Sequence, residues 1–280
     1  MRVETTNSKK LEETIQKIAK DGMQSLHVLA DFDRTLTKAF VNGKFISSMI
    51  TILREDGDYL APEYAPQAHA LYHHYGPIEN DPKVPLLEKK KIMEEWWQAH
   101  FNLLIKYGLS QSDVKKVAES GKLKFRDQFP DFLKILAEND VPLVIMSANP
   151  LGGEAIFTLL EKEGLNSENI DVIGNDFIWG NDGKARDVKK PIIHSFNKDE
   201  TLLQNFPAFD NIKNRTNVLL LGDGLGDIGM AEGFDYKNII KVGFLSGDES
   251  QLPDYVENYD AVILGDGSFE YVNNLIRKIL

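Results

Sequence analysis

The chain has 280 residues, of which 42% are hydrophobic and 27% charged, and its formal net charge is −11 at pH 7. This length suits one large globular domain, or a domain with an insertion. The negative charge argues against nucleic acids and anionic membranes as partners, because its field repels polyanions. The absence of cysteine excludes disulfides, thiolate nucleophiles and cysteine-bound zinc.

The opening segment, residues 1–22, lacks the apolar core of a signal peptide. No apolar run in the sequence reaches the roughly 18 residues that a membrane-spanning helix needs. We therefore expect a cytoplasmic protein without a membrane partner. The sequence gives no expectation for the oligomeric state.

The beginning of the chain predicts a helix followed by a buried strand. Leu11, Ile15 and Ile18 recur at helical spacing, and the turn residues 21–22 end this helix before an apolar strand over 26–30. From about residue 125 onward, helices alternate with short apolar strands. The predicted helices are 130–140, 153–164, 199–206 and 268–280, and the predicted strands are 141–146, 170–174, 217–222, 238–244 and 260–264. Uniformly apolar strands separated by helices imply a parallel sheet covered on both faces, with ligands bound beyond the carboxyl ends of the strands.

The region from 40 to 124 has a different, helical character. Residues 87–108 predict one long helix, and a shorter helix follows over 110–121, with Ser110 and Asp113 spaced as a capping box. Asn-Asp-Gly within 177–186 predicts a hairpin. We therefore expect an α/β core domain over 1–39 and 125–280, and an inserted helical cap domain over 40–124.

Two pairs of aspartates directly follow apolar strands. Asp31 and Asp33 in "HVLADFDRTLT" point to one side if the chain is extended, and Asp223 and Asp227 follow the strand "LLLG". Carboxylates gathered at one sheet edge repel each other unless a cation neutralises them, and oxygen ligands of this kind favour magnesium. A single loop aspartate more often makes a turn or caps a helix. Four of them at two strand ends favour the metal site.

A third strand end has the composition of a phosphate-binding loop. Ser147 follows the strand in "VIMSANP", and Gly152 and Gly153 open the next helix, where a hydroxyl and backbone N–H groups can hold phosphate. A lysine is expected to complete this site, and three are candidates: Lys189, Lys190 and Lys198.

The glycines Gly224, Gly226 and Gly229 also satisfy the spacing of a dinucleotide-binding loop. In that interpretation Asp223 and Asp227 would flank a pyrophosphate without counter-charge, late in the chain. We favour glycines that support acidic metal ligands.

Together these motifs resemble the haloacid dehalogenase superfamily of aspartate-nucleophile phosphatases, and more closely its cytosolic pyrimidine 5'-nucleotidase family. The residues that carry the resemblance are "DFDRTLT" (31–37), "IENDP" (78–82), "MEEWW" (93–97), "VIMSAN" (144–149), "IIHSFNKDE" (192–200) and "LLLGDGLGD" (219–227). The likeness runs from about residue 10 to the C-terminus. It implies a Rossmann-like parallel-sheet core with an inserted helical cap.

The resemblance also implies roles for individual residues. Asp31 is the expected nucleophile and Asp33 the general acid and base, while Lys198 holds the transferring phosphate. Ser147 and Ala148 bind that phosphate, and Asp31, Asp33, Asp223 and Asp227 serve the magnesium ion. In the cap, Glu79 reads the nucleobase and Trp96 lies near it. From pattern alone, Glu79 is a solvated loop acid and Trp96 packs between helices, so both interpretations stay open.

Two positions depart from the family pattern: Asn149 stands where glycine is common, and Gly224 where relatives have serine. The resemblance implies a magnesium-dependent 5'-nucleotidase that hydrolyses UMP and CMP through an aspartyl-phosphate, with 7-methylguanosine monophosphate as a further candidate substrate. The alternatives are phosphotransfer between nucleosides, a phosphatase of another small metabolite, and a binding module without activity.

Overall fold

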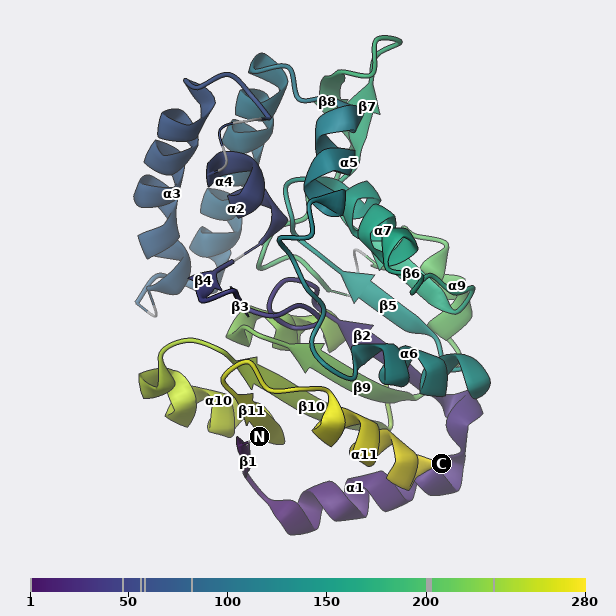
Figure 1. The fold of residues 1–280 in the computed structure, drawn as a ribbon. Coiled ribbons are helices and arrows are strands. Elements are labelled where there is room, and N and C mark those ends of the chain that lie inside the picture. The colour runs from purple at the N-terminus through teal and green to yellow at the C-terminus, as the bar shows by residue number, and fades with distance from the viewer. Residues whose placement is uncertain are drawn as a thin grey trace.

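The computed structural model describes residues 2–46, 48–55, 57, 59–81, 83–199, 203–233 and 235–280. Within these residues the main sheet has seven strands in the order β1-β11-β10-β9-β2-β5-β6 (Figure 1). The strands are β1 Arg2–Thr5, β2 Leu26–Ala30, β5 Leu143–Met146, β6 Ile170–Ile173, β9 Asn217–Gly222, β10 Asn238–Leu245 and β11 Ala261–Leu264. The small hairpins are β3 Phe40–Val41 with β4 Lys44–Phe45, and β7 Phe177–Trp179 with β8 Ala185–Val188.

The sheet is parallel from β11 to β6, as the sequence predicts. In its centre, Ala30 at the end of β2 pairs with Leu221 of β9 on one side and Ile145 of β5 on the other. The prediction missed β1, which pairs antiparallel with β11 at the sheet edge. This strand is mostly exposed and polar, so it lacks the apolar run that marked the others.

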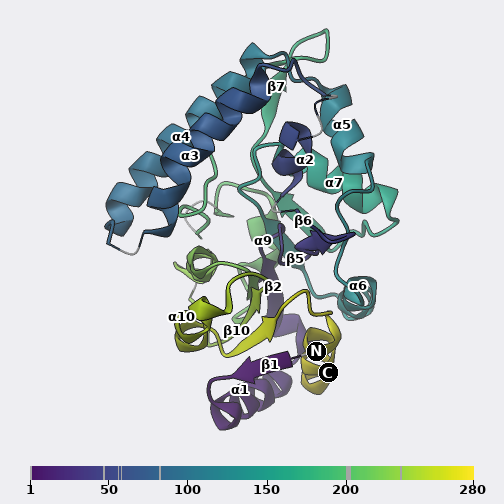
Figure 2. The same ribbon diagram turned by 60° about the vertical axis from the view of Figure 1, so that its left-hand side comes forward.

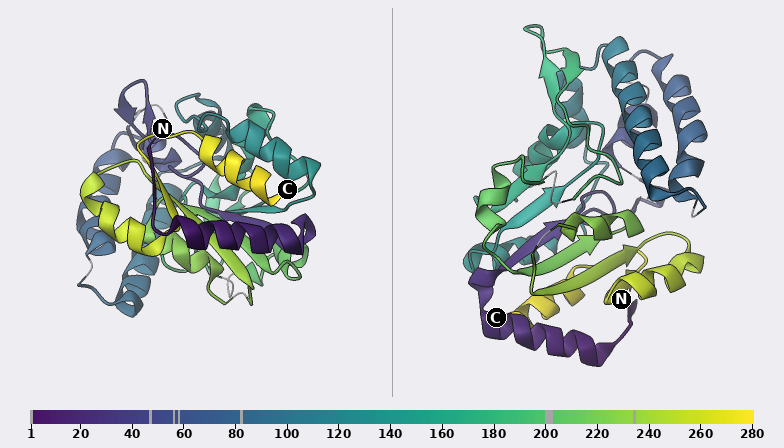
Figure 3. Two further views of the ribbon diagram at one scale, coloured as in Figure 1. Left: turned by 90° about the horizontal axis from the view of Figure 1, so that it is seen from below. Right: turned by 180° about the vertical axis from the view of Figure 1, so that it is seen from behind.

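Helices cover both faces of the sheet, because successive strand residues point to opposite sides. Leu219 and Leu221 belong to the core under α1, α6, α7 and α11, whereas Val218 and Leu220 belong to the core under α9 and α10. Helices α1 and α11 lie side by side (Figure 3). These helices are α1 Ser8–Asp21, α6 Phe129–Glu138, α7 Gly152–Lys162, α9 Ala208–Ile212, α10 Leu252–Asn258 and α11 Glu270–Ile279.

Among the described residues between β4 and α6, four helices form what we call the helical segment: α2 Met49–Glu55, α3 Tyr64–Asn80, α4 Leu86–Lys106 and α5 Gln111–Glu119. Helices α3 and α4 pack together and project beyond the sheet (Figure 2). The predicted capping box is confirmed, since Ser110 Oγ accepts from Asp113 N and Asp113 Oδ2 accepts from Ser110 N. Hairpin β7/β8 contacts α4. The domain limits at 39/40 and 124/125 stay a prediction.

The predicted elements otherwise agree with the structure to within a few residues. The helix predicted over 199–206 includes residues 200–202, which lie outside the described residues. In the part of the chain that is described, no helix combines the length and apolarity needed to cross a bilayer.

Candidate active site

Three adjacent strands, β9, β2 and β5, bring the predicted motifs to one edge of the sheet. Asp31 N donates to the Leu221 carbonyl at 3.0 Å, which ties the end of β2 to that of β9. Between the two carboxylates of this motif, Phe32 is fully buried and its ring meets that of Phe125 edge-on at 6.2 Å. This anchored aromatic ring leaves Asp31 and Asp33 on the opposite side of the strand.

Lys198 lies at the centre of the acidic cluster. Its Nζ donates to Asp31 Oδ1 and to Asp227 Oδ1, each at 2.6 Å. Burial alone lowers the pKa of Lys198, but Asp227 and Asp31 outweigh burial and raise that pKa above its ordinary value. The ammonium is therefore charged and divides its interaction between two carboxylates.

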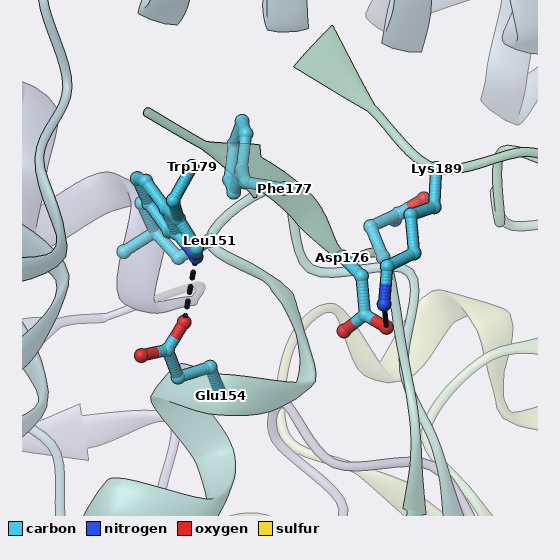
Figure 4. Close-up of a pocket in the computed structure, with 7 residues that line it drawn as sticks. Leu151, Glu154, Asp176, Phe177, Trp179 and Lys189 are labelled. Atoms are coloured by element: carbon cyan, nitrogen blue, oxygen red, sulfur yellow. Dashed lines mark hydrogen bonds and ion pairs between the residues drawn. The ribbon is translucent and has the colours of Figure 1, made fainter. Parts of the chain in front are cut away.

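The other two candidate lysines lie elsewhere. Lys189 Nζ pairs with Asp176 Oδ2 at 3.2 Å, beside a surface pocket that also contains Glu154 and Trp179 (Figure 4). Lys190 donates to Gln98 of α4. Of the three lysines proposed from the sequence, the structure brings Lys198 to the carboxylates.

The loop after β9 is held by Asp227. Its Oδ2 accepts from Asp223 N at 3.1 Å and from Gly224 N at 2.9 Å. A Cβ at Gly222 would come within 2.5 Å of the Asp227 Cβ, so glycine is required at the end of the strand. Both carboxylate oxygens of Asp227 are thus engaged by the protein, and this residue positions Lys198 and the Asp223 backbone.

Arg34 is a second cation in the cluster, and the sequence analysis did not single it out. Its Nη2 lies 2.8 Å from Asp223 Oδ2. Its backbone has φ 61°, a left-handed conformation in the turn after Asp33. The guanidinium of Arg126 is fully buried and stabilises this turn by donating to the backbone carbonyls of Arg34 and Thr35.

The acidic residues outnumber the cations beside them. Burial is the largest cause that raises the pKa of Asp31 and of Asp33 to about 7, and that of Asp223 to about 6. Carboxylate oxygens of Asp31, Asp223 and Asp227 lie within 4.8 Å of one another. When all four aspartates are ionised, Lys198 and Arg34 leave an excess of two negative charges, which a divalent ion with oxygen ligands would neutralise. The donor set therefore fits magnesium.

The predicted phosphate loop adjoins this cluster. Ser147 is buried after β5, and Gly152 has φ 86°, with Asn175 O only 2.3 Å from where its Cβ would lie. The loop therefore requires glycine at 152. Asn149 Nδ2 donates to Asp33 Oδ2 at 2.8 Å, so the departure noted in the sequence contacts a predicted catalytic residue.

Helices α3 and α4 contact loops at this edge of the sheet: Glu79 of α3 contacts Ser195, and Trp97 of α4 contacts Ala148. Ser195 Oγ donates to Glu79 Oε1, and burial raises the pKa of Glu79. Arg34, Lys89 and Lys198 lower that pKa by their charge, Arg34 most among the three, which places Glu79 within the field of the acidic cluster. The interpretation of Glu79 as a solvated loop acid is therefore wrong.

Trp96 and Trp97 have different surroundings on α4. Trp96 is buried and stacks on Tyr75 at 5.8 Å and 17°. Tyr75 lies four residues before Glu79, hence on the same side of α3. Trp97 Nε1 donates to the Ala148 carbonyl at 2.7 Å. Trp97, which the sequence analysis did not select, is thus the tryptophan that contacts the phosphate loop.

The structure brings most of the predicted residues together. The residues at the shared edge are Asp31, Asp33, Ser147, Ala148, Lys198, Asp223 and Asp227. Glu79 lies close enough for Arg34 and Lys198 to lower its pKa. Trp96 is farther from the edge and stacks on Tyr75. The contacts that were not predicted involve Arg34, Trp97, Asn149 and Ser195, which lie inside the quoted motifs, and Arg126, which lies outside them. Nothing in the spacing of these residues indicates a partner.

Comparison with known proteins agrees with this geometry. A family model described as pyrimidine 5'-nucleotidase (UMPH-1) matches residues 34–280, so the match begins directly after Asp31 and Asp33. The "7-methylguanosine phosphate-specific 5'-nucleotidase" of Homo sapiens is 32% identical over 273 residues, covering 97% of this chain and 90% of that protein.

Solved structures show the same similarity. Cytosolic 5'-nucleotidase IIIB bound to cytidine superposes with a TM-score of 0.89 at 27% identity, covering 99% of this chain and 93% of the other. A haloacid dehalogenase family hydrolase from Salmonella enterica serovar Typhi has a TM-score of 0.60 at 15% identity, covering 98% of this chain and 82% of the other. At this low identity the similarity concerns the fold alone. The fold is thus the predicted haloacid dehalogenase-like α/β fold. The chain belongs to the pyrimidine 5'-nucleotidase family and is a phosphoric monoester hydrolase of the 5'-nucleotidase class.

Proposed function

We propose that this chain is a magnesium-dependent 5'-nucleotidase that hydrolyses UMP, CMP or 7-methylguanosine monophosphate through an aspartyl-phosphate intermediate. The observation that carries the proposal is the position of Asp31, buried at the sheet edge between the Lys198 ammonium and the loop of Asp223. A carboxylate in these surroundings can act as a nucleophile toward a phosphate whose charge is neutralised.

Asp31 attacks the phosphorus in line. Lys198 binds Asp31 Oδ1, and we assign the attack to Oδ2, which Thr35 Oγ1 approaches at 3.4 Å. The new P–O bond to Asp31 forms as the bond to the ribose oxygen breaks, and Asp33 protonates the departing oxygen. Asp33 then takes a proton from water, whose oxygen attacks phosphorus and breaks the bond to Asp31. Inorganic phosphate leaves, and both aspartates return to their starting states.

The remaining edge residues hold the charge of the phosphate. The Ser147 hydroxyl and the backbone at Ala148 bind phosphate oxygens at the start of the loop before α7. Asp31, Asp223 and the Asp33 backbone carbonyl would hold magnesium, with Asp227 positioning the loop of Asp223. The bound ion supplies the positive charge that lets an anionic nucleophile approach an anionic ester.

Glu79 is proposed to accept a hydrogen bond from the exocyclic amine of the base, and Trp96 to supply an aromatic face. Glu79 is half-buried, and among the described residues Ser195 donates to its carboxylate, which supports a carboxylate that gains from a further donor. Both cytosine and 7-methylguanine carry such an amine. The names of the human relative and of the cytidine-bound neighbour agree with this substrate class.

The proposed partner is a small nucleotide rather than a nucleic acid or a membrane, in keeping with the negative net charge. A relative of Caenorhabditis elegans is named "Putative cytosolic 5'-nucleotidase 3", and we propose a cytoplasmic location for this chain as well.

A phosphate-release screen over nucleoside monophosphates, with and without magnesium, tests the proposal. Wild-type protein should release phosphate from at least one candidate nucleotide only with the metal, and Asp31→Asn should abolish turnover while the protein stays folded. Asp131→Asn on the exposed surface of α6 is the matched control. Near-normal activity of Asp31→Asn would end the proposal, and nucleotide formed from added nucleoside would indicate phosphotransfer instead.

A further inference from the structure

We propose that Asn149 is a positioning residue that fixes the carboxyl of Asp33 in one orientation for proton transfer. The inference rests on the proposed function, in which Asp33 is the general acid and base. It concerns a residue that departs from the family pattern and that the mechanism above does not use.

Asn149 joins the ends of β2 and β5. It is only 4% exposed, and its Nδ2 donates to Asp33 Oδ2 at 2.8 Å. Its Oδ1 accepts from Leu151 N at 2.9 Å, and its own backbone N–H donates to Ser147 Oγ at 3.1 Å. One residue thus connects the proposed proton donor with the phosphate-binding hydroxyl.

The orientation of the Asn149 amide is determined by its neighbours. The Leu151 backbone N–H can only donate, so the carbonyl oxygen of the amide must face it. The NH₂ group then faces Asp33 and cannot become an acceptor. Asp33 Oδ2 is consequently held as a hydrogen-bond acceptor whether or not the carboxyl carries a proton.

The second oxygen of Asp33 has different surroundings. Asp33 Oδ1 is buried and has no close hydrogen-bond partner among the described residues, and the backbone N–H of Met49 is the further donor that acts on this carboxyl besides Asn149. Because Asn149 occupies Oδ2, Oδ1 is the oxygen left to exchange a proton with the leaving group and then with water. Without Asn149 the carboxyl can rotate, and the proton is no longer kept on a defined oxygen.

This role predicts a dependence on the leaving group. A ribose alkoxide is strongly basic and needs protonation as the P–O bond breaks, whereas a nitrophenolate is weakly basic and departs unaided. Loss of Asn149 should therefore lower kcat/KM for a nucleoside monophosphate much more than for p-nitrophenyl phosphate. The ratio kcat/KM is the appropriate quantity, because it includes departure of the leaving group but not the later hydrolysis of the intermediate.

The experiment measures both esters with wild-type protein, Asn149→Ala and Asn149→Leu in saturating magnesium. We expect a loss of about 10- to 100-fold for the nucleotide and less than about threefold for the nitrophenyl ester. The expected loss is at or below the lower end of the roughly 10²- to 10⁴-fold contribution of general acid catalysis, because Asp33 itself is still present. Asn149→Leu removes the donor to Asp33 and fills a similar volume without adding charge. It should show the same selective loss even if Asn149→Ala folds poorly.

Asn175→Ala is the structural control. Asn175 is also buried, and its side chain accepts from Ile193 N and donates to Ile193 O, both at 2.9 Å. Its Nδ2 also lies 3.5 Å from the Ala148 carbonyl, so its loss can slow both esters but does not touch Asp33. Its truncation should leave the ratio between the two esters at the wild-type value. Equal losses on both esters in the Asn149 variants would overturn the inference. Wild-type protein inactive on every nucleotide would instead overturn the proposed function, and the inference with it.

Discussion

The sheet edge and the helical segment contribute to the site in different ways. At the edge, charged residues follow strands that are hydrogen-bonded neighbours, so Lys198 meets Asp31 and Asp227 at 2.6 Å. On α3 and α4, the residues near the site are selected by helix register, and they contact it through single hydrogen bonds. Glu79 meets Ser195 and Trp97 meets Ala148 in this way.

This difference indicates a division of labour. The edge holds the excess negative charge and the proposed nucleophile, which every phosphate ester would require. In the helical segment, Trp97 contacts the phosphate loop, whereas Glu79 and Trp96 make their contacts outside that loop. Changes at the edge and at Trp97 should thus lower activity on all substrates, whereas changes at Glu79 and Trp96 should alter the ranking of substrates.

After Asp31→Asn, the largest effect is expected from Asp223→Asn. This change removes one carboxylate of the proposed metal site and also the partner of Arg34. Activity should fall by about 10²- to 10³-fold on every nucleotide, similar to the loss of one electrostatic group in other active sites. Calorimetric titration with magnesium should show weakened binding, whereas Asp131→Asn should bind as wild type. Unchanged magnesium affinity would place the metal elsewhere.

A smaller and selective effect is expected from Glu79→Gln. A hydrogen bond to a charged group contributes about 1.5–3 kcal/mol, so kcat/KM for CMP should fall by about 10- to 100-fold. UMP lacks the exocyclic amine and should lose far less. Glu94→Gln, an exposed change on α4, is the control. Equal losses for CMP and UMP would assign Glu79 to packing against Ser195 rather than to selectivity.

Trp97→Phe and Trp96→Phe compare the two tryptophans of α4. Trp97→Phe removes the donor 2.7 Å from the Ala148 carbonyl and leaves that carbonyl with the longer contact from Asn175 Nδ2 at 3.5 Å. The loss of one such hydrogen bond costs about 0.5–1.5 kcal/mol. We expect a lower thermal midpoint and a several-fold lower kcat/KM on all nucleotides for Trp97→Phe. Trp96→Phe keeps an aromatic face beside Tyr75 and should change the ratio between bases more than the overall rate. If instead Trp96→Phe lowers activity on all nucleotides and Trp97→Phe changes the ratio between bases, the roles assigned to the two tryptophans are reversed.

These contrasts also separate what the sequence predicts from what it does not. Asp31, Ser147 and Asp223 were predictable because parallel strands bring their carboxyl ends to one edge whatever the loops do. Lys198 does not directly follow a strand. Its sequence spacing alone therefore could not favour it over Lys189 and Lys190 as the phosphate-binding lysine.

Other contacts depend on tertiary packing that no local pattern encodes. Arg126 supports the turn after β2 from 91 residues away in sequence, and Asn149 reaches Asp33 across 116 residues. Trp96 and Trp97 are neighbours in sequence, yet helix geometry turns them about 100° apart, so only coordinates distinguish their partners. The polar strand β1 lacks the apolar run by which the other strands were found.

The smallest effect on activity, and a specific effect on stability, is expected from His100 of α4. His100 is buried in the helical segment, where its Nε2 hydrogen-bonds with the Tyr64 hydroxyl at 2.9 Å. Burial lowers its pKa from 6.5 to about 4. The folded protein therefore keeps this ring neutral at a pH where the unfolded chain protonates it. The stabilisation is fully present above pH 6.5 and is lost as the pH falls from 6.5 toward 4.

His100→Gln should reduce the loss of stability between pH 7 and pH 4.5 by about 1–3 kcal/mol and leave the ratio of CMP to UMP hydrolysis at pH 7 unchanged. Denaturant unfolding followed by tryptophan fluorescence is suited to this test, since the three tryptophans lie on α4 and hairpin β7/β8. His74→Gln, an exposed change on α3, is the control. His27 and His194, whose pKa values burial also lowers to about 4, remain in the variant, so part of the pH dependence should persist. If His100→Gln and His74→Gln unfold with the same pH dependence as wild type, the helical segment does not hold a buried neutral imidazole. In that case the acid sensitivity of the protein would originate outside the helical segment, for example at His27 on β2 of the main sheet.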